Sequence, residues 1–302
     1  MANLSLEING LIKRFGKFTA LNGIDLQINE GEVFGYIGPN GVGKTTTIRV
    51  LLGILQATEG NAKVFGMDAW KDAVEIHKRI AYVPGDVNLW ANLTGGEVID
   101  LFVSLRGKHD KARREKLLQM FELDPSKKCR TYSKGNRQKV ALVAAFASDA
   151  DLFILYEPTS GLDPLMEMVF QECILEQKNN GKGVFLSSHI MSEVERLCDR
   201  VGIIREGKLV ETGTLKELRH LTRLNMNIET ETPVEGLAAI QGVHKVNAWH
   251  GHDGLSFQVD STEINAVISH ISKFGVKRLE SMPPTLEDLF MRHYTAAQEG
   301  GE

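Results

Sequence analysis

Residues 38–45 read Gly-Pro-Asn-Gly-Val-Gly-Lys-Thr, which fits the pattern G-x-x-x-x-G-K-[ST]. An apolar, strand-like run, 33–37, precedes this stretch, and a segment with helical character, 45–52, follows it. Glycines let backbone N–H groups close on phosphate oxygens, and a helix N-terminus adds the positive end of its dipole. The stretch therefore predicts a phosphate-binding loop, in which Lys44 reaches the β- and γ-phosphates and the Thr45 hydroxyl is a magnesium ligand.

Outward from this loop, short apolar runs alternate with helical stretches up to about residue 220. This alternation predicts an α/β core with a mostly parallel sheet. The expected strands are 24–28, 33–37, 80–83, 152–156 and 184–187. The expected helices are 45–52, 96–105, 111–121, 138–147 and 164–178.

The pattern changes after about His220, which predicts two domains, 1–220 and 221–302. The order becomes β-α-β-β-α-β, with a short helix at 234–240, an amphipathic helix across 264–271 and a last helix near 286–293. This order is typical of a small α+β domain of the split-βαβ, ferredoxin-like kind. Charge supports the division, because residues 221–302 carry 6 basic and 11 acidic side chains, a net −5.

Composition excludes several classes of protein. The chain has 302 residues, 25% of them charged, and a net charge of −4, which is ordinary for a globular protein and excludes a disordered chain. The near balance of charge argues against a nucleic-acid partner. No window approaches about 18 consecutive apolar residues, so we expect no membrane span.

Three further segments follow the phosphate loop in a fixed order. Residues 132–136 read Tyr-Ser-Lys-Gly-Asn, 152–164 read Leu-Phe-Ile-Leu-Tyr-Glu-Pro-Thr-Ser-Gly-Leu-Asp-Pro, and 186–189 read Leu-Ser-Ser-His. With these segments, residues 4–220 resemble the ATP-binding subunits of ABC transporters. The tail, with Pro-Thr-Leu-Glu-Asp-Leu-Phe at 284–290, resembles the small C-terminal domain of drug- and antibiotic-type export ATPases.

The resemblance implies a role for each matching residue. Glu157 would polarise the attacking water, and His189 would contact the γ-phosphate. Phe15 would stack on adenine, with Phe18 as its rival. Residues 160–163 would form the D-loop, and Ser133 and Gly135 would close over ATP held by a second subunit. The catalytic group would be Lys44, Glu157 and His189, and the nucleotide-binding residues Phe15, Gly38, Pro39, Asn40, Gly41, Val42, Gly43, Lys44, Thr45, Thr46, Ser133, Gly135 and Asp163.

The sequence departs from the family pattern at three places. Tyr156 stands where the Walker B strand of the family has Asp, which helps to hold Mg²⁺ through its water shell. Gly85 stands where a Gln should touch the metal, so the candidate protein ligands are Thr45 and the neighbouring Asp86. The usual signature Leu-Ser-Gly-Gly-Gln is Tyr-Ser-Lys-Gly-Asn, which keeps the Ser and the second Gly.

The leading interpretation is an ATPase, requiring ATP and Mg²⁺, that drives a separate transmembrane permease from the cytoplasmic face of the membrane. Two copies, or two related subunits, would sandwich two ATP molecules. We favour a working site with a local change at Tyr156 and reduced activity. One alternative is a nucleotide-binding regulator with impaired hydrolysis. Another is a non-transport ABC ATPase, although only 87 residues separate Lys44 from Tyr132, too few for the coiled-coil insertion of the DNA-repair type.

Overall fold

The computed structural model of the chain describes residues 3–106, 110–220, 223–251, 253–260, 262–282, 285–287 and 289–290. The chain divides into two compact units, Met1–Thr212 and Gly213–Glu302, at a boundary eight residues before the expected one. No helix among the described residues has both the length and the apolar character needed to cross a bilayer.

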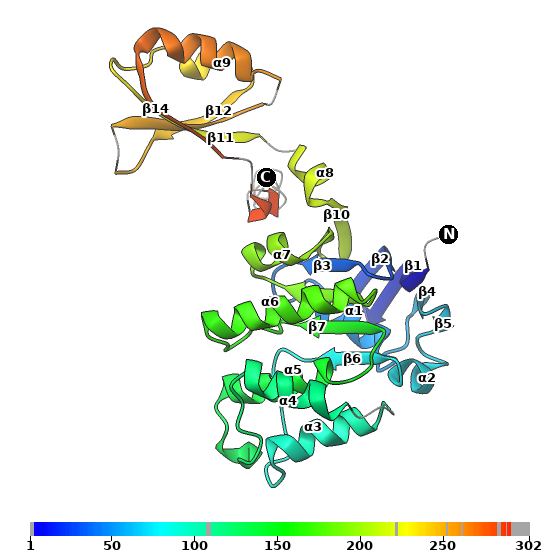
Figure 1. The fold of residues 1–302 in the computed structure, drawn as a ribbon. Coiled ribbons are helices and arrows are strands. Elements are labelled where there is room, and N and C mark those ends of the chain that lie inside the picture. The colour runs from blue at the N-terminus through cyan, green and yellow to red at the C-terminus, as the bar shows by residue number, and fades with distance from the viewer. Residues whose placement is uncertain are drawn as a thin grey trace. The chain divides into compact units, whose positions relative to one another are not determined.

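A six-stranded sheet forms the centre of the first unit, in the order β10-β9-β3-β8-β7-β6 (Figure 1). The pairings of β6 with β7, β7 with β8, β8 with β3 and β3 with β9 are all parallel. The five strands joined by these parallel pairings are mostly buried, as expected where both faces of a sheet are covered, whereas the edge strand β10 is mostly exposed or half-buried. Their bounds are β3 (Val33–Ile37), β6 (Ile80–Val83), β7 (Leu152–Tyr156), β8 (Gly183–Ser188), β9 (Arg200–Arg205) and β10 (Lys208–Thr214).

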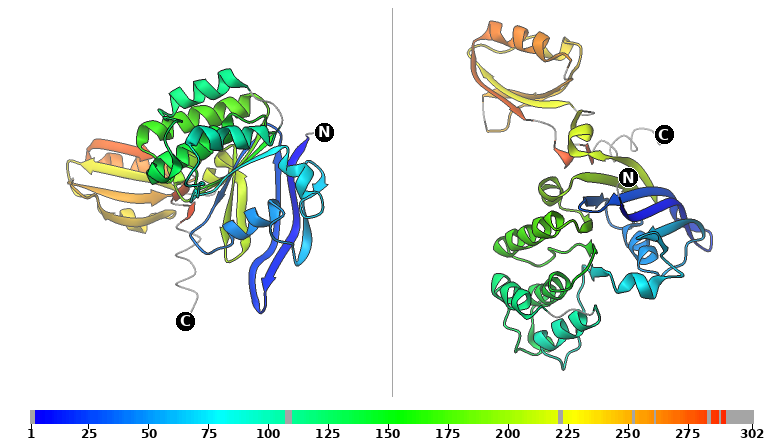
Figure 2. Two further views of the ribbon diagram at one scale, coloured as in Figure 1. Left: turned by 90° about the horizontal axis from the view of Figure 1, so that it is seen from below. Right: turned by 45° about the vertical axis from the view of Figure 1, so that its right-hand side comes forward.

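A second, antiparallel sheet has the order β2-β1-β4-β5. It comprises β1 (Leu4–Phe15), β2 (Phe18–Asn29), β4 (Glu59–Val64) and β5 (Met67–Asp68). Its buried residues form one apolar cluster with residues of the central sheet and of helix α1 (Lys44–Leu51). The core that supports the phosphate loop therefore lies between the two sheets (Figure 2).

The remaining helices of this unit fall into two groups. Helices α6 (Pro164–Asn179) and α7 (Met191–Leu197) cover the face of the central sheet opposite the antiparallel sheet (Figure 2). Helices α3 (Gly95–Ser104), α4 (Lys111–Met120) and α5 (Lys134–Phe146) pack together beyond β6 as a helical subdomain (Figure 1). The short elements are α2 (Ala73–His77) and η1 (Cys129–Thr131).

The second unit is built on an antiparallel sheet in the order β12-β13-β11-β14. Its strands are β11 (Leu224–Thr230), β12 (Val243–Ala248), β13 (Gly254–Val259) and β14 (Val276–Met282). Helix α9 (Ile264–Ile271) contributes Val267 and Ile271 to its core. This arrangement confirms the ferredoxin-like α+β fold. Helix α8 (Leu215–His220) and the 3₁₀ turn η3 (Ser272–Phe274) also belong to this unit.

The helix expected at 234–240 is wrong, because only a 3₁₀ turn, η2 (Leu237–Ala239), forms there. Gly236, with φ +71°, starts the turn and Ile240 is already extended, so no helical run can continue. Of the expected last helix, Leu286, Glu287, Leu289 and Phe290 are helical. The rest of that helix, and Pro284 and Asp288 of the tail motif, lie outside the described residues.

The register of the central sheet brings three strand ends together. Ile37, the last residue of β3, pairs with Ser188 of β8, and Tyr156 at the end of β7 pairs with Ser187. Because the three strands are parallel neighbours, the residues that follow them meet at one edge. Ligands of open parallel sheets bind at the carboxyl ends of the strands. The phosphate loop, Glu157 and His189 all follow these ends, so this edge is the candidate site.

Candidate functional site

The phosphate loop runs from the end of β3 to the start of α1. Gly43 is the N-cap of α1, in a left-handed conformation with φ +117°. A Cβ at this position would lie 2.8 Å from Cδ2 of Leu21 and 2.9 Å from the carbonyl oxygen of Ala20. Only glycine satisfies both constraints, so the loop is held against β2 while the first turn of the helix points its N–H groups outward.

Lys44 is folded back onto its own loop. Its ammonium group donates to the carbonyl of Gly38 and, at 3.1 Å, to that of Pro39, and its side chain is only 3% exposed. Burial lowers the pKa of Lys44, and the nearby carboxylate of Glu157 opposes this shift. A buried ammonium held by two neutral carbonyls is ready to exchange them for phosphate oxygens.

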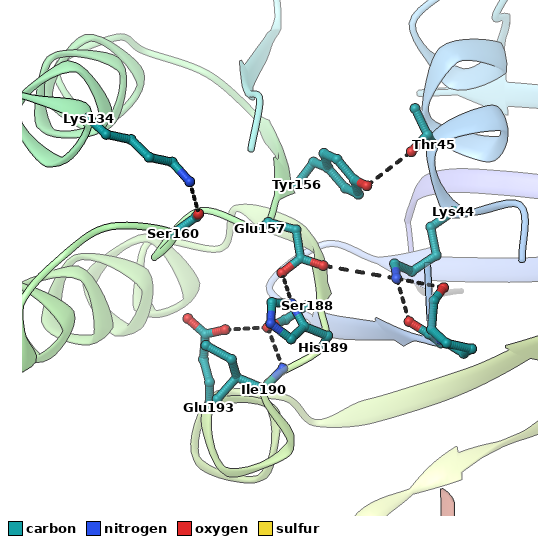
Figure 3. A network of polar contacts seen from close by, with 12 residues as sticks. Lys44, Thr45, Lys134, Tyr156, Glu157, Ser160, Ser188, His189, Ile190 and Glu193 are labelled. Atoms are coloured by element: carbon teal, nitrogen blue, oxygen red, sulfur yellow. Dashed lines mark hydrogen bonds and ion pairs between the residues drawn. The ribbon is translucent and has the colours of Figure 1, made fainter. Parts of the chain in front are cut away.

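Glu157 lies where β7 ends, and its two oxygens face different partners (Figure 3). Oε1 is buried, lacks a hydrogen bond and lies 4.0 Å from Nζ of Lys44. Oε2 accepts a hydrogen bond from Nδ1 of His189, whose side chain is 63% exposed. The backbone of Glu157 has φ +48°, uncommon for a non-glycine residue, and its N–H donates to the carbonyl of Ser187 at 2.8 Å. The carboxylate is thus fixed between a cation and an exposed imidazole.

Ser188 and Glu193 shape the turn that carries His189. The Ser188 hydroxyl donates to Oε2 of Glu193 at 2.6 Å and accepts from the backbone N–H of Ile190 at 3.1 Å. Burial raises the pKa of Glu193, while its hydrogen bonds with Ser188 and Thr159 act in the opposite direction. Sequence reasoning missed this pair, for which the only signal was an acid four residues after the histidine.

Thr45 and Tyr156 meet across the same edge. The Thr45 hydroxyl donates to the phenolic oxygen of Tyr156 at 3.1 Å (Figure 3). Asp86, the other candidate metal ligand, is exposed in the loop after β6. Among the described residues no group of three or more His, Cys, Asp or Glu side chains could hold a metal. The donor set still fits Mg²⁺ bound mainly through nucleotide phosphates and water, because Mg²⁺ rarely uses an all-protein cage.

Phe15 and Phe18 flank the turn between β1 and β2. They are direct cross-strand partners, with 48% and 65% of their surfaces exposed. The ammonium of Lys13 lies 5.1 Å from the centre of the Phe15 ring. Both rings are exposed enough to stack on a planar ligand, so their exposure does not decide which of them would contact adenine. The role of Phe15 stays a prediction.

The signature segment forms the start of α5. Ser133 is the N-cap and accepts from the backbone N–H of Asn136 at 3.2 Å, so the helix begins four residues before the expected Gln138. That expected start was wrong because a serine cap places the following three residues in the first turn. Lys134, whose contact the sequence left open, donates to Oγ of Ser160 at 2.8 Å. A Cβ on Gly135 would lie 2.5 Å from the carbonyl oxygen of Gly161.

Two groups of predicted residues therefore form. At the carboxyl edge of the sheet Lys44 faces Glu157, Glu157 binds His189, and Thr45 binds Tyr156 (Figure 3). Ser133, Gly135 and Asp163 lie in the second group, where α5 meets the loop before α6. The carboxylate of Asp163 caps α6 by accepting from the N–H of Met166 at 3.0 Å. The other loop positions differ in burial: Gly38 is buried, Pro39, Val42 and Thr46 are half-buried, and Asn40 and Gly41 are exposed.

Gln138 joins the helical subdomain to the site, and sequence reasoning gave it no role. Its side chain is 1% exposed and donates to the carbonyl of Pro158 at 2.9 Å and to that of Pro84 at 3.4 Å. Pro158 follows Glu157, and Pro84 precedes Gly85. One buried amide therefore links α5 to the loops after β6 and β7.

Comparison with protein families agrees with this geometry. Residues 21–160 match the ABC transporter family, and residues 213–294 match the C-terminal domain of DrrA1-3-like ATP-binding proteins. The first match includes the phosphate loop, the signature and Glu157. The second covers almost all of the second unit.

Individual relatives extend the match to nearly the whole chain. The uncharacterized ABC transporter ATP-binding protein YhaQ of Bacillus subtilis is 32% identical over 97% of this chain and 100% of its own length. The bacitracin transport ATP-binding protein BcrA of Enterococcus faecalis is 27% identical, with 95% of each chain covered. A solved ATP-binding subunit of an ABC transporter is 32% identical, with a TM-score of 0.68, over 72% of this chain and 92% of that one.

The phosphate loop at the carboxyl edge of the sheet agrees with these matches. Together they show that the fold is that of an ATP-binding cassette. The chain belongs to the ABC transporter ATP-binding proteins, in the group that carries a DrrA-like C-terminal domain.

Proposed function

We propose that this chain is the ATP-hydrolysing subunit of an ABC exporter of the multidrug or antibiotic type, acting on a separate transmembrane permease at the cytoplasmic face of the membrane. The observation that carries the proposal is the meeting of Lys44, Glu157 and His189 at the edge formed by β3, β7 and β8. The name of the bacitracin transport relative and the DrrA-like domain support the export class.

Each side chain has a defined task in this proposal. The ammonium group of Lys44 gives up its hydrogen bonds to the loop carbonyls, binds phosphate oxygens and balances the negative charge of the phosphates. Glu157 holds the attacking water and draws its proton, a role that suits a carboxylate with one oxygen free of hydrogen bonds. His189, exposed and hydrogen-bonded to Glu157, contacts the γ-phosphate. Mg²⁺, when bound, would neutralise phosphate charge, and the Thr45 hydroxyl would serve as a protein ligand for it.

The second group of site residues supports association of two ATPase subunits. Ser133 is exposed at the N-terminus of α5, where a hydroxyl and free N–H groups suit the phosphates of a nucleotide held by another subunit. Lys134 joins this segment to Ser160 of the loop before α6. Nucleotide bound between two copies would therefore meet both segments.

The experiment measures Mg²⁺-dependent ATP hydrolysis and self-association of the purified chain. We expect turnover in the native chain, and ATP-dependent dimers in Glu157→Gln, which binds ATP but hydrolyses it slowly. Ser133→Arg at the expected interface should abolish the dimers, while Ser126→Arg, in the loop after α4, should not. Absence of both ATP binding and hydrolysis would contradict the proposed function.

A second candidate function rests on Tyr156. A neutral side chain at the end of β7 supports a subunit that binds ATP and hydrolyses it slowly, acting as a regulator. The test compares the Mg²⁺-ATPase rate of the native chain with that of Tyr156→Asp. A clear gain in the variant would support the regulator, and equal rates would contradict impairment by Tyr156.

A further inference from the structure

The hydrogen bond between Thr45 and Tyr156 fixes how the threonine presents its oxygen. A hydroxyl has one proton to donate and two lone pairs that accept. Thr45 donates its proton to the phenolic oxygen of Tyr156 at 3.1 Å. The lone pairs of Thr45 are then left for another partner, and a cation is the partner that lone pairs attract. The phenol thus acts as an acceptor at this position without adding a charge.

The ring of Tyr156 is held in place independently of this hydrogen bond. Both Tyr156 and Tyr82, on the neighbouring strand β6, pack against the apolar cluster between the two sheets. The ring is therefore part of the packing that supports the site. A smaller side chain at position 156 would remove that packing as well as the hydroxyl.

Gly85 lies against the same ring. A Cβ at this position would lie 3.0 Å from Cβ of Glu157, 3.1 Å from the carbonyl oxygen of Tyr156 and 3.3 Å from Cδ1 of the Tyr156 ring. All three distances are tighter than ordinary contacts between carbon and neighbouring atoms, about 3.5 Å or more. The carbonyl oxygen would be there with any residue at position 156, so the contact of 3.3 Å with Cδ1 is the one by which the tyrosine ring limits the space at Gly85.

Tyr156 and Gly85 are two departures from the family pattern that lie 71 residues apart in the sequence but lie against each other in the structure. We propose that Tyr156 and Gly85 act as one unit, in which the Tyr156 hydroxyl positions Thr45 for the magnesium of the bound nucleotide and Gly85 makes room for the Tyr156 ring. Tyr156 is a positioning residue here, because it acts through Thr45. The magnesium part of this inference rests on the proposed function, whereas the packing part does not.

The first experiment measures the affinity of the full chain for ATP by equilibrium dialysis, in EDTA and in excess Mg²⁺. The ratio of the two affinities is the readout, because a merely structural defect would change both affinities together. Tyr156→Phe keeps the ring and removes the hydroxyl. We expect its Mg²⁺ enhancement to fall about fivefold, the size of one ordinary hydrogen bond, with the affinity in EDTA unchanged. Tyr156→Asp restores a charge and should raise the enhancement above the native value.

The chain offers a matched control on the same helix. The hydroxyl of Tyr36 forms a buried hydrogen bond with Thr47, 3.2 Å long and two residues beyond Thr45. Tyr36→Phe removes a tyrosine–threonine hydrogen bond from α1 that does not face the phosphates. We expect this variant to lose stability but to keep the native Mg²⁺ enhancement.

The outcomes separate the inference from the proposed function. If the native chain binds ATP neither in EDTA nor in Mg²⁺, both the proposed function and the positioning role of Tyr156 are overturned. If the native chain binds ATP and Tyr156→Phe leaves the Mg²⁺ enhancement unchanged, only the positioning role of Tyr156 is overturned. An equal loss of enhancement in Tyr36→Phe would also overturn it, because the effect would then belong to the helix and not to Thr45.

The second experiment tests whether the Tyr156 ring limits the space at Gly85, and it needs no ligand. Gly85→Ala is combined with Tyr, Phe or Asp at position 156, and the melting temperature is measured for each pair. Over-packing should lower the melting temperature by about 2–4 °C with Tyr or Phe present. The loss should be about half as large with Asp, since the contact with Cδ1 is gone while those with Glu157 and the carbonyl remain. An equal loss in all three backgrounds would overturn the coupling.

Discussion

The phosphate loop and the end of β7 lie at the same edge of one sheet, but they differ in how closely they follow the family pattern. The loop keeps every expected residue, and Gly43 has the left-handed backbone that its position needs. The end of β7 keeps Glu157 and replaces the residue beside it with Tyr156. Of the two regions, only the end of β7 departs from the family pattern, and there Tyr156 contacts Thr45 of the loop that follows the pattern. The variants below change the two regions and the residues that support them, and the expected effects decrease from Glu157→Gln to Glu193→Gln.

Glu157→Gln tests the end of β7 most severely. The change keeps the shape of the side chain but removes the base, so we expect turnover to fall at least about 100-fold with ATP affinity retained. Turnover is measured by phosphate release and affinity by equilibrium dialysis. Glu172→Gln, at an exposed position on α6, is the matched control. Turnover within twofold of the native value would remove Glu157 from the reaction.

Lys44→Met tests the phosphate loop. Methionine fills the buried space but removes the charge that is held by the carbonyls of Gly38 and Pro39. We expect ATP affinity to fall about 100-fold, equivalent to about 3 kcal/mol for lost charge-assisted hydrogen bonds. Lys63→Met, on the exposed surface of β4, should bind ATP like the native chain. If both variants bind normally, the loop does not hold phosphate through Lys44.

Gln138→Leu tests the link between the helical subdomain and both loops. Leucine has a similar volume but leaves the carbonyls of Pro158 and Pro84 without their buried donor. We expect the free energy of unfolding to fall by about 1–3 kcal/mol and the melting temperature by about 5 °C. The exposed Gln119→Leu on α4 controls for the gain in apolar surface. Equal melting temperatures for the two variants would show that the link adds no stability.

Glu193→Gln has the smallest expected effect and a defined dependence on pH. Burial raises the pKa of Glu193 above 4.5, so the native state keeps the proton at pH values where the unfolded chain has lost it. The contribution of Glu193 to stability is therefore lost as the pH rises from 4.5 through its folded-state pKa, and the glutamine variant lacks this pH-dependent contribution. The stability advantage of the variant should grow with pH over that window in urea denaturation, with Glu172→Gln as the control for loss of one charge. A constant difference would contradict this.

Much of this site could be predicted from the sequence because its residues lie at the ends of buried parallel strands. Val33–Ile37 and Leu152–Tyr156 match β3 and β7 at both ends, since strands buried on both faces give unbroken apolar runs. The antiparallel sheet was mostly missed. β1 is half exposed and its pairing with β2 contains several register shifts, so its apolar residues do not alternate cleanly.

The contacts within the site could not be predicted. Tyr156 lies 111 residues from Thr45 in the sequence, and no local pattern joins the two. The tight packing of Gly85 against the Tyr156 ring is equally non-local. The start of α5 was misplaced for a different reason, because Ser133 was assigned only to ligand binding although serine is also a common helix cap.

The backbone of Glu157 has a consequence for how this site tolerates mutation. Its N–H is bound to the carbonyl of Ser187, so β8, and not the neighbouring side chain, fixes where the carboxylate begins. A substitution at position 156 can therefore change the side chain that faces Thr45 while the backbone hydrogen bond that holds Glu157 stays in place. An altered residue at 156 is thus compatible with an otherwise intact site.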